Sequence, residues 1–357
     1  MKKTRAAIIL AAVYYLSPGG CSRNPSIPME IIEITPLLEL NAVIPDYKIM
    51  PFFNLFQNMA IDQQGNIYYL KFGHDRIQKF DKTGRLAADI GGIGQGADAL
   101  FSPTAILVEN DSLYVLNDAG RQVKIFSLDG EFKSSFKIDH AWSPTSLFVD
   151  REAIYVNVID KSNKTRNDGK LISVYDHEGR LVKKIGPIIK CNSMIGYNTF
   201  NRIRMIARDE NIYYAFINQP LISWSGKNGG RTAVLDLRKF GIPVIDAIAG
   251  RIDAEGIDTP ETFKDDSVSS GTCLSFCSGF AVDEAGRIFY IPNAAGSGSR
   301  DEWDNSILLF NENHKLSKKI YLKTGKETVT PRDFLIAGGK AIYGIGTIKE
   351  RSILFKF

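Results

Sequence analysis

The chain has 357 residues, of which 44% are hydrophobic and 24% charged, and its formal net charge is +4 at pH 7. Without Lys2, Lys3 and Arg5, which lie in an N-terminal leader, the charge falls to about +1 (+4 minus three). This balance gives no electrostatic basis for binding nucleic acid or an anionic surface. We therefore expect no nucleic-acid partner.

The first 20 residues have the order of an export signal. A basic start precedes the apolar run Ala6–Leu16, which is too short to span a bilayer, and small residues then precede Cys21. This order resembles a bacterial lipoprotein signal, in which Cys21 is lipidated and becomes the mature N-terminus. Residues 21–29 would then be a tether. The alternative is an ordinary cleaved signal, with Cys21 incidental.

The segment Met59–Gly91 predicts four short strands, A to D, joined by tight turns. Its clearest feature is the apolar–aromatic pair that opens strand B. Six such pairs occur: Ile67-Tyr68, Leu113-Tyr114, Ile154-Tyr155, Ile212-Tyr213, Ile288-Phe289 and Ile342-Tyr343. An aromatic residue ends strand C at Phe80, Phe126, Tyr175, Trp224, Phe310 and Phe357. Because one such meander cannot bury both its faces alone, the copies must pack on each other.

The last unit lacks a strand D. It has Phe334–Ala337, Ala341–Ile345 and Ile353–Phe357, and an unpaired third strand would expose an apolar edge. We predict that Glu30–Thr35 closes the ring as the outer strand of this unit. The sequence thus predicts an all-β fold, a six-bladed β-propeller of four-stranded antiparallel blades over residues 30–357, monomeric and in one domain.

One stretch carries a family resemblance. It runs from Gly91 through Phe101-Ser102-Pro103-Thr104 to Leu113-Tyr114-Val115 and Phe126. It resembles the NHL-type repeat, and the mature chain resembles the six-bladed propeller lipoproteins of bacteria that contain it. The resemblance implies an architecture and an extracytoplasmic location, on a bacterial membrane and most naturally the outer one. It implies no ligand.

The lengths of the connections differ between the two faces of the predicted ring. The A–B and C–D turns stay short, whereas the B–C and D–A connections include five long ones: Gly91–Pro103, Asp160–Lys170, Gly186–Asn201, Gly241–Ser278 and Pro292–Ser306. We call the side of the long connections the loop face. Long insertions confined to one face of a repeat protein favour a binding face.

Candidate ligand-binding residues lie in or beside these connections. The aromatic candidates are Trp142, Tyr197, Phe200 and Trp303, which could stack on sugars or fill protein pockets, or else pack between blades. Arg202 and Arg204 are two apart on the predicted innermost strand of blade 4 and so share a side. They either line the central channel for an anionic group or bridge to carboxylates of a neighbouring blade.

Cysteines and histidines give no clear metal or catalytic site. Apart from Cys21, the cysteines are Cys191, Cys273 and Cys277, which fall in connections of the loop face and could form one disulfide in an exported protein. The sequence does not choose the pair. His177 and His314 are predicted in C–D turns of the opposite face. We expect no metal, no cofactor and no catalytic residue.

The leading hypothesis is a non-catalytic, membrane-tethered propeller that binds a partner protein or a glycan through its loop face. One alternative is a channel-mouth hydrolase or lyase, similar to lactonases of the propeller fold and perhaps metal-dependent. Another is a structural subunit of a membrane complex. The fold alone does not choose among them.

Overall fold

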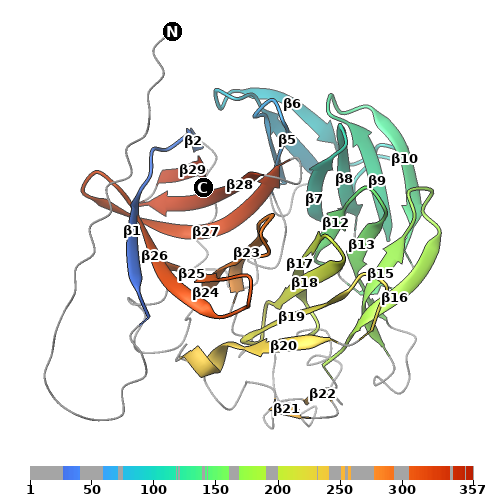
Figure 1. The fold of residues 1–357 in the computed structure, drawn as a ribbon. Helices are drawn as coiled ribbons and strands as arrows, with labels where there is room; N and C mark the ends of the chain where they lie inside the picture. Colours follow the sequence, from blue (N-terminus) through green and yellow to red (C-terminus); the bar gives the residue numbers. More distant parts are fainter. Residues whose placement is uncertain are drawn as a thin grey trace, which may run out of the picture.

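A computed structural model describes residues 27–40, 59–70, 75–117, 119, 121–138, 141–142, 144–160, 169–189, 200–230, 232–240, 251–253, 256–258, 277–292, 305–337, 341–349 and 351–356. Over these residues the protein is built from β-strands arranged as a ring (Figure 1). The export signal and Cys21 lie outside the described residues.

Four blades are separate four-stranded antiparallel sheets. Blade 1 consists of β3 (Met59–Ile61), β4 (Ile67–Leu70), β5 (Arg76–Phe80) and β6 (Leu86–Gly91). Blade 2 consists of β7 (Pro103–Glu109), β8 (Ser112–Asn117), β9 (Gln122–Ser127) and β10 (Phe132–Lys137). Blade 3 consists of β12 (Leu147–Val149), β13 (Ile154–Asn157), β15 (Lys170–Tyr175) and β16 (Leu181–Pro187). Blade 4 consists of β17 (Ile203–Arg208), β18 (Asn211–Phe216), β19 (Leu221–Gly226) and β20 (Ala233–Asp236), and is followed by the 3₁₀ helix η2 (Leu237–Phe240).

The last two units are joined in one larger sheet. Blade 5 consists of β23 (Cys277–Val282), β24 (Ile288–Pro292), β25 (Ser306–Phe310) and β26 (Leu316–Thr324). Blade 6 consists of β27 (Glu327–Ala337), β28 (Ala341–Ile348), β29 (Arg351–Lys356) and the N-terminal β2 (Leu38–Leu40). A hairpin from β26 into β27 links the two. Two short ribbons pair β11 (Ala141–Trp142) with β14 (Ile159–Asp160), and β21 (Arg251–Asp253) with β22 (Gly256–Asp258).

The predicted all-β meander is confirmed, and the six apolar–aromatic pairs all lie in second strands, namely β4, β8, β13, β18, β24 and β28. The innermost strands contact one another in the cyclic order β3, β7, β12, β17, β23, β27 and back to β3. The apolar side chains of these strands and of their neighbours are mostly buried, because the sheets of adjacent blades pack face to face.

The prediction for the N-terminal strand is wrong in its residues. The segment around Glu30 forms β1 (Met29–Glu33), which pairs in parallel with β26 at the outer edge of blade 5. The next strand along the chain, β2, pairs antiparallel with β29 in blade 6. The length of β26 explains the difference, because this strand has nine residues. It pairs with β25 along one edge, and the backbone groups of its other edge pair with β1.

Repeated aspartates shape the short turns. In the A–B turn of blade 1, the Asp62 carboxylate accepts hydrogen bonds from the backbone N–H groups of Gln64 (2.9 Å) and Asn66 (2.8 Å). The same arrangement recurs at Asp81, Asp176, Asp283 and Asn311. The residue three positions on has a positive φ, at Gly65, Gly84, Gly179, Gly286 and His314. These turns are therefore specified by their own residues.

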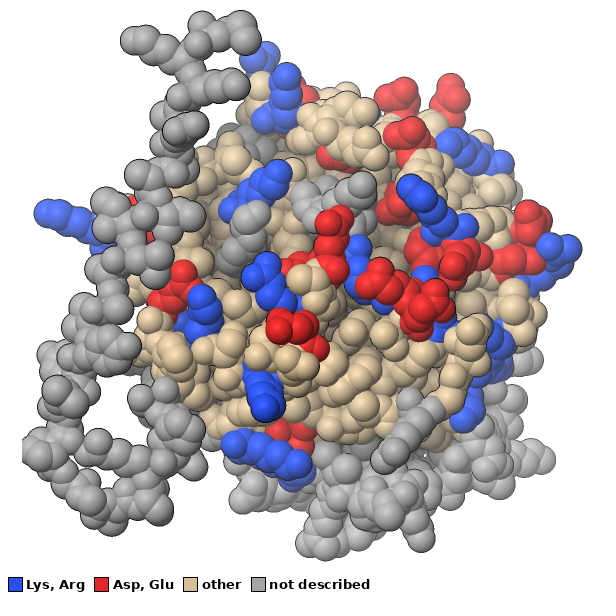
Figure 2. Space-filling view, viewed as in Figure 1, with Lys and Arg blue, Asp and Glu red and all other residues tan. Residues whose placement is uncertain are grey.

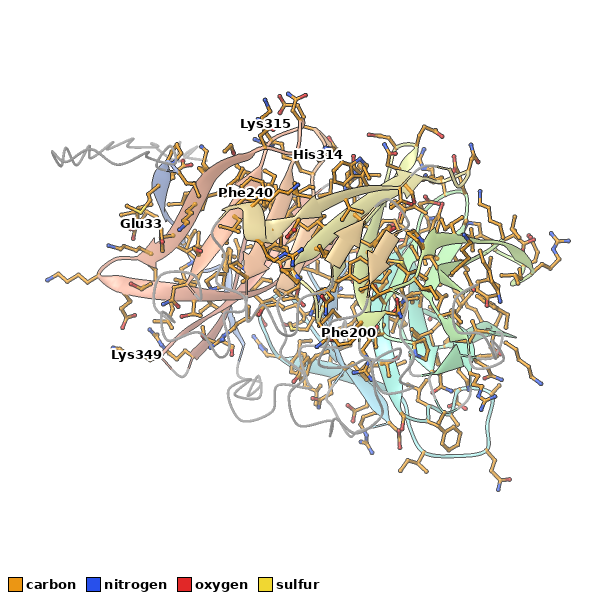
Figure 3. The ribbon with its side chains drawn as sticks, turned by 90° about the horizontal axis from the view of Figure 1, so that it is seen from below. Glu33, Phe200, Phe240, His314, Lys315 and Lys349 are labelled. Carbon is orange, nitrogen blue, oxygen red and sulfur yellow. The ribbon has the colours of Figure 1, made fainter. Side chains whose placement is uncertain are left out.

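The C–D turns also hold neighbouring blades together. A Cβ at Gly179 in blade 3 would overlap Phe136 on the outer strand of blade 2, so the bare glycine lets the two blades approach. In blade 5 the corresponding position is His314, whose ring lies 3.9 Å (centroid to centroid) from Trp224 of blade 4. His314 and His177 both lie in C–D turns, as predicted. Figure 3, an edge-on view of the ring, shows His314 and Lys315 toward one face and Phe200 and Lys349 toward the other.

Candidate binding face and central channel

A cavity of about 50 Å³ lies where the six innermost strands meet, which is room for a few water molecules. All six strands contribute to its wall. The lining is apolar apart from Arg204 and Ser146, and its other members are Met59, Ala60, Leu107, Phe148, Met205, Ile206, Phe280 and Phe334. Among the described residues, the centre of the ring is thus lined mainly by hydrophobic side chains.

The polar feature of this channel is an ion pair between blades 4 and 6. Nη1 of Arg204 lies 2.7 Å from both carboxylate oxygens of Asp333, and the two side chains are 13% and 12% exposed. The backbone N–H of Phe334 donates to the same carboxylate at 2.7 Å. Burial raises the pKa of the Asp333 carboxyl, and the Arg204 guanidinium opposes that rise. The pair therefore joins two blades that are not neighbours in the ring.

Cys277 lies close to this pair, at the start of β23. Its side chain is fully buried, and its Sγ lies 3.6 Å from the carbonyl oxygen of Gly279. Burial raises the pKa of the Cys277 thiol to about 12, with Arg204 opposing the rise and Asp333 adding to it. A thiol in this environment is protonated at neutral pH and packs as a small apolar group.

On the loop face, the connection Gly92–Ser102 between β6 and β7 is held by hydrogen bonds from a buried lysine. Nζ of Lys124, on β9, donates to the carbonyl oxygens of Ala97 (2.7 Å) and Ala99 (2.5 Å). Lys124 is only 5% exposed, and burial lowers the pKa of its amine. The loop carbonyls accept hydrogen bonds from this amine. They thereby avoid the free-energy cost of a few kcal/mol that a buried donor without acceptors would carry.

Further contacts hold both ends of this connection. The backbone N–H of Leu100 donates to the carbonyl of Gly92 (3.0 Å), and that of Phe101 donates to the side-chain oxygen of Asn117 (2.6 Å). Leu100 is completely buried in the core between blades 1 and 2. A Cβ at Gly91, where φ is +74°, would come within 2.5 Å of Leu100. The loop is therefore packed onto the ring as one fixed piece.

This fixed loop exposes two large apolar side chains. Ile93 is 83% exposed and Phe101 is 41% exposed. Exposure of single apolar residues is ordinary, but here two of them are displayed by one loop whose backbone is held by its neighbours. Side chains presented in this way bind with a small loss of conformational entropy. The loop is thus suited to recognition.

Between blades 3 and 4, a buried polar network holds the roots of other long connections. The Asn157 side chain donates to the carbonyl oxygens of Leu171 (2.9 Å) and Asn201 (3.2 Å) and accepts from the Thr145 hydroxyl (3.0 Å). The Asn201 side chain in turn bonds both backbone groups of Ile189 (2.7 and 3.1 Å). The long connections on this face therefore start from ordered ends.

The predicted site residues do not come together as one site. Phe200 is 2% exposed and packs in the main core. The prediction that it stacks on a ligand is therefore wrong, and the alternative, that it is a packing residue, agrees with the structure. Of the two alternatives for Arg204, the structure shows the ion pair with a carboxylate, but the partner Asp333 belongs to blade 6 and not to a neighbouring blade as expected. Arg202 lies directly before β17, half-buried, with its carbonyl accepting from Ile217 (3.0 Å). Trp224 packs on Tyr213, as expected for a strand C residue.

Other predicted residues stay untested. Trp142 lies in β11, where the structure gives the backbone path alone. Tyr197, Trp303, Cys191 and Cys273 lie outside the described residues, so the cysteine pairing stays a prediction. Lys124 and Asp333 were missed. A lysine inside the apolar strand Gln122–Ser127 is the signal that could have identified the first.

Among the described residues, there is no cluster of three or more His, Cys, Asp or Glu side chains placed to hold a metal ion. The described part of the chain also contains no helix long and apolar enough to cross a membrane. Figure 2 shows Lys and Arg interspersed with Asp and Glu on the face in view, so charge of both signs is mixed there.

The fold and the ring of meanders define a β-propeller. The model of the DUF5128 family, described as a 6-bladed beta-propeller, matches residues 61–248, which is more than half of the chain. The chain belongs to this family of six-bladed propellers. No curated protein matches it.

Solved structures share the fold at low identity. A member of the DUF4221 family from Bacteroides vulgatus is 11% identical, with a TM-score of 0.50, covering 84% of this chain and 91% of that one. A streptogramin B lyase is 12% identical (TM-score 0.46, covering 89% and 96%). Virginiamycin B lyase from Staphylococcus aureus is 9% identical (TM-score 0.45, covering 84% and 94%). At these identities the likeness concerns the fold alone.

Proposed function

We propose that the protein is a non-catalytic, extracytoplasmic binding propeller, held to a bacterial membrane through a lipid on Cys21, and that its loop face engages a partner protein. The leader of residues 1–20 supports the location. The observation that carries the binding role is the Gly92–Ser102 loop, fixed by Lys124 yet displaying Ile93 and Phe101.

A protein fits this loop better than a glycan does. Sugar rings stack on aromatic side chains, and the most exposed side chain here is aliphatic Ile93. An apolar anchor on a preorganised loop is typical of a protein contact, in which a few buried side chains provide most of the binding energy. The partner is therefore expected to present an apolar pocket to Ile93.

The test is capture of the partner from the detergent-solubilised membrane of the native host. The parent protein is compared with an I93D/F101A variant and with a matched L181D/V182D variant. Leu181 and Val182 are exposed apolar residues (40% and 59%) on the rim of blade 3, away from the loop. Buried apolar anchors contribute about 1.5–3 kcal/mol each, so the loop variant should retain the partner at least tenfold less well.

Three results would count against the proposal. The loop variant could capture the partner as well as the parent does, or the rim variant could lose it equally. Alternatively, the captured species could survive digestion of the membrane extract with protease, which would identify a glycan. Intact-mass measurement of the mature N-terminus separately tests whether Cys21 is acylated.

A further inference from the structure

The outer rim of blade 5 carries an added strand that the other described blades lack. β1 lies along β26 in parallel, and its ends are held by hydrogen bonds from Lys319 N–H to the Pro28 carbonyl (2.9 Å) and from Ile34 N–H to the Lys323 carbonyl (2.8 Å) (Figure 1). Since alternate residues of a strand direct their backbone groups to opposite sides, those of Met29 and Ile31 face away from β26. No described strand pairs with that edge.

This edge is more apolar than an ordinary free edge. Met29 is 73% exposed and Ile31 is 61% exposed, whereas Ile32 packs against the core. Exposed edges are normally protected by charge. The outer strand of blade 2 has that protection, with Lys133 and Lys137 in β10, whereas β16 of blade 3 carries Lys183 and Lys184 beside the exposed Leu181 and Val182.

The two carboxylates of β1 are already engaged by β26 and its hairpin. Glu30 forms an ion pair with Nζ of Lys318 (2.7 Å), and Glu33 accepts a hydrogen bond from the backbone N–H of Gly325. Lys323 and Lys326 add positive charge on the same rim. The rim thus combines protruding apolar side chains with lysines, which is the composition of surfaces that lie in a bilayer interface.

The position of β1 in the chain limits where this rim can be. Seven residues lie between Cys21 and Met29, and the eight Cα-to-Cα steps of a fully extended chain span at most about 29 Å. If Cys21 is lipidated, β1 is the described strand nearest to the anchor in the sequence. A rim with apolar and basic groups so close to an anchor has a bilayer surface as its nearest partner.

We propose that the rim formed by β1 and β26 rests on the membrane surface, with Met29 and Ile31 in the lipid interface and Lys323 and Lys326 near anionic headgroups. This inference rests on the proposed lipid anchor. It sets the propeller on its edge, so that neither turn face of the ring is pressed against the bilayer. The loop face with Ile93 then stays accessible to a partner.

The test replaces the lipid by a tether of known chemistry. The chain from Ser22 onward, which keeps every described element, carries an N-terminal hexahistidine tag and is bound to phosphatidylethanolamine–phosphatidylglycerol vesicles with a nickel-chelating lipid. Oxidation of Met29 by hydrogen peroxide is followed by mass spectrometry. Buried Met59 and Met205 report that the fold is intact.

The expected result is an approximately fivefold slower oxidation of Met29 on vesicles than in solution. In an I31D variant, with the same tether and the same reporter, oxidation should return to the solution rate. Oxidation of Met29 at the solution rate in the parent, or equal slowing in I31D, would overturn the proposal. So would light scattering that shows a dimer broken by I31D, because β1 would then bind a second copy of the chain. Since the tag replaces the lipid, none of these outcomes depends on acylation of Cys21.

Discussion

Arg204→Met removes the cation that faces the buried carboxylate of Asp333 while keeping an unbranched side chain that fills part of the same space. Both side chains are only slightly exposed, so solvent screens the interaction weakly. Breaking a buried pair by removing one partner typically costs 3–5 kcal/mol, because the other charge stays buried and unpaired, whereas replacing both by apolar groups is often nearly neutral. We therefore expect R204M to lose about 3–5 kcal/mol of unfolding free energy and R204M/D333L to recover most of it.

Urea unfolding followed by tryptophan fluorescence measures this cycle, with unchanged m-values as the check that both states keep their compactness. The pH dependence gives a second readout. Burial raises the pKa of Asp333 above its ordinary 3.8, so the folded state binds a proton more readily than the unfolded chain does. Stability from this group is therefore greatest at low pH and falls as pH rises above 3.8, more steeply in R204M, where the opposing cation is gone. A loss below about 1 kcal/mol in R204M, or additive effects in the cycle, would show that Arg204 and Asp333 do not form a stabilising pair.

Three further changes test other parts of the structure. Lys124→Met should free the Gly92–Ser102 loop, which would be seen as faster amide hydrogen exchange at Leu100, and should lower the free energy of unfolding by about 1–3 kcal/mol. Unchanged exchange at Leu100 would show that Lys124 does not hold the loop. Gly179→Ala should cost more than 1 kcal/mol in thermal unfolding, because the new methyl overlaps Phe136 at a positive φ, and a neutral result would dispute that packing. His314→Gly relieves a positive φ worth about 1 kcal/mol but removes the ring that packs on Trp224. Its net effect on the free energy of unfolding should therefore stay within about 1 kcal/mol, and a larger loss would contradict this balance.

The strands of the ring could be predicted because each has a local cause. Alternation, the pairs such as Ile67-Tyr68, and glycine at turns such as Gly84 all act within a few residues. Partner choice is different. Glu30–Thr35 and the adjoining Leu38–Leu40 are both short and partly apolar, and local pattern does not distinguish a parallel addition to β26 from an antiparallel one to β29.

The polar centre could not be predicted for a similar reason. Arg204 and Asp333 are 129 residues apart in sequence. A register shift between Pro331 and Asp333 changes the pairing of β27 at that point, and irregularities of this kind redirect side chains. Lys124 also contradicts its local pattern, since a lysine is ordinarily expected in solvent and this one is buried beneath a loop. Long-range packing, which periodicity does not encode, decides both positions.

In the proposed function, the loop face and not the short-turn face meets the partner. A photoactivatable amino acid placed at position 93 on the loop face, and separately at exposed Glu312 in a short turn of blade 5, tests this directly in intact membranes. We expect one discrete crosslinked partner from position 93 and none from position 312. Crosslinking from position 312 alone, or none from position 93, would contradict it.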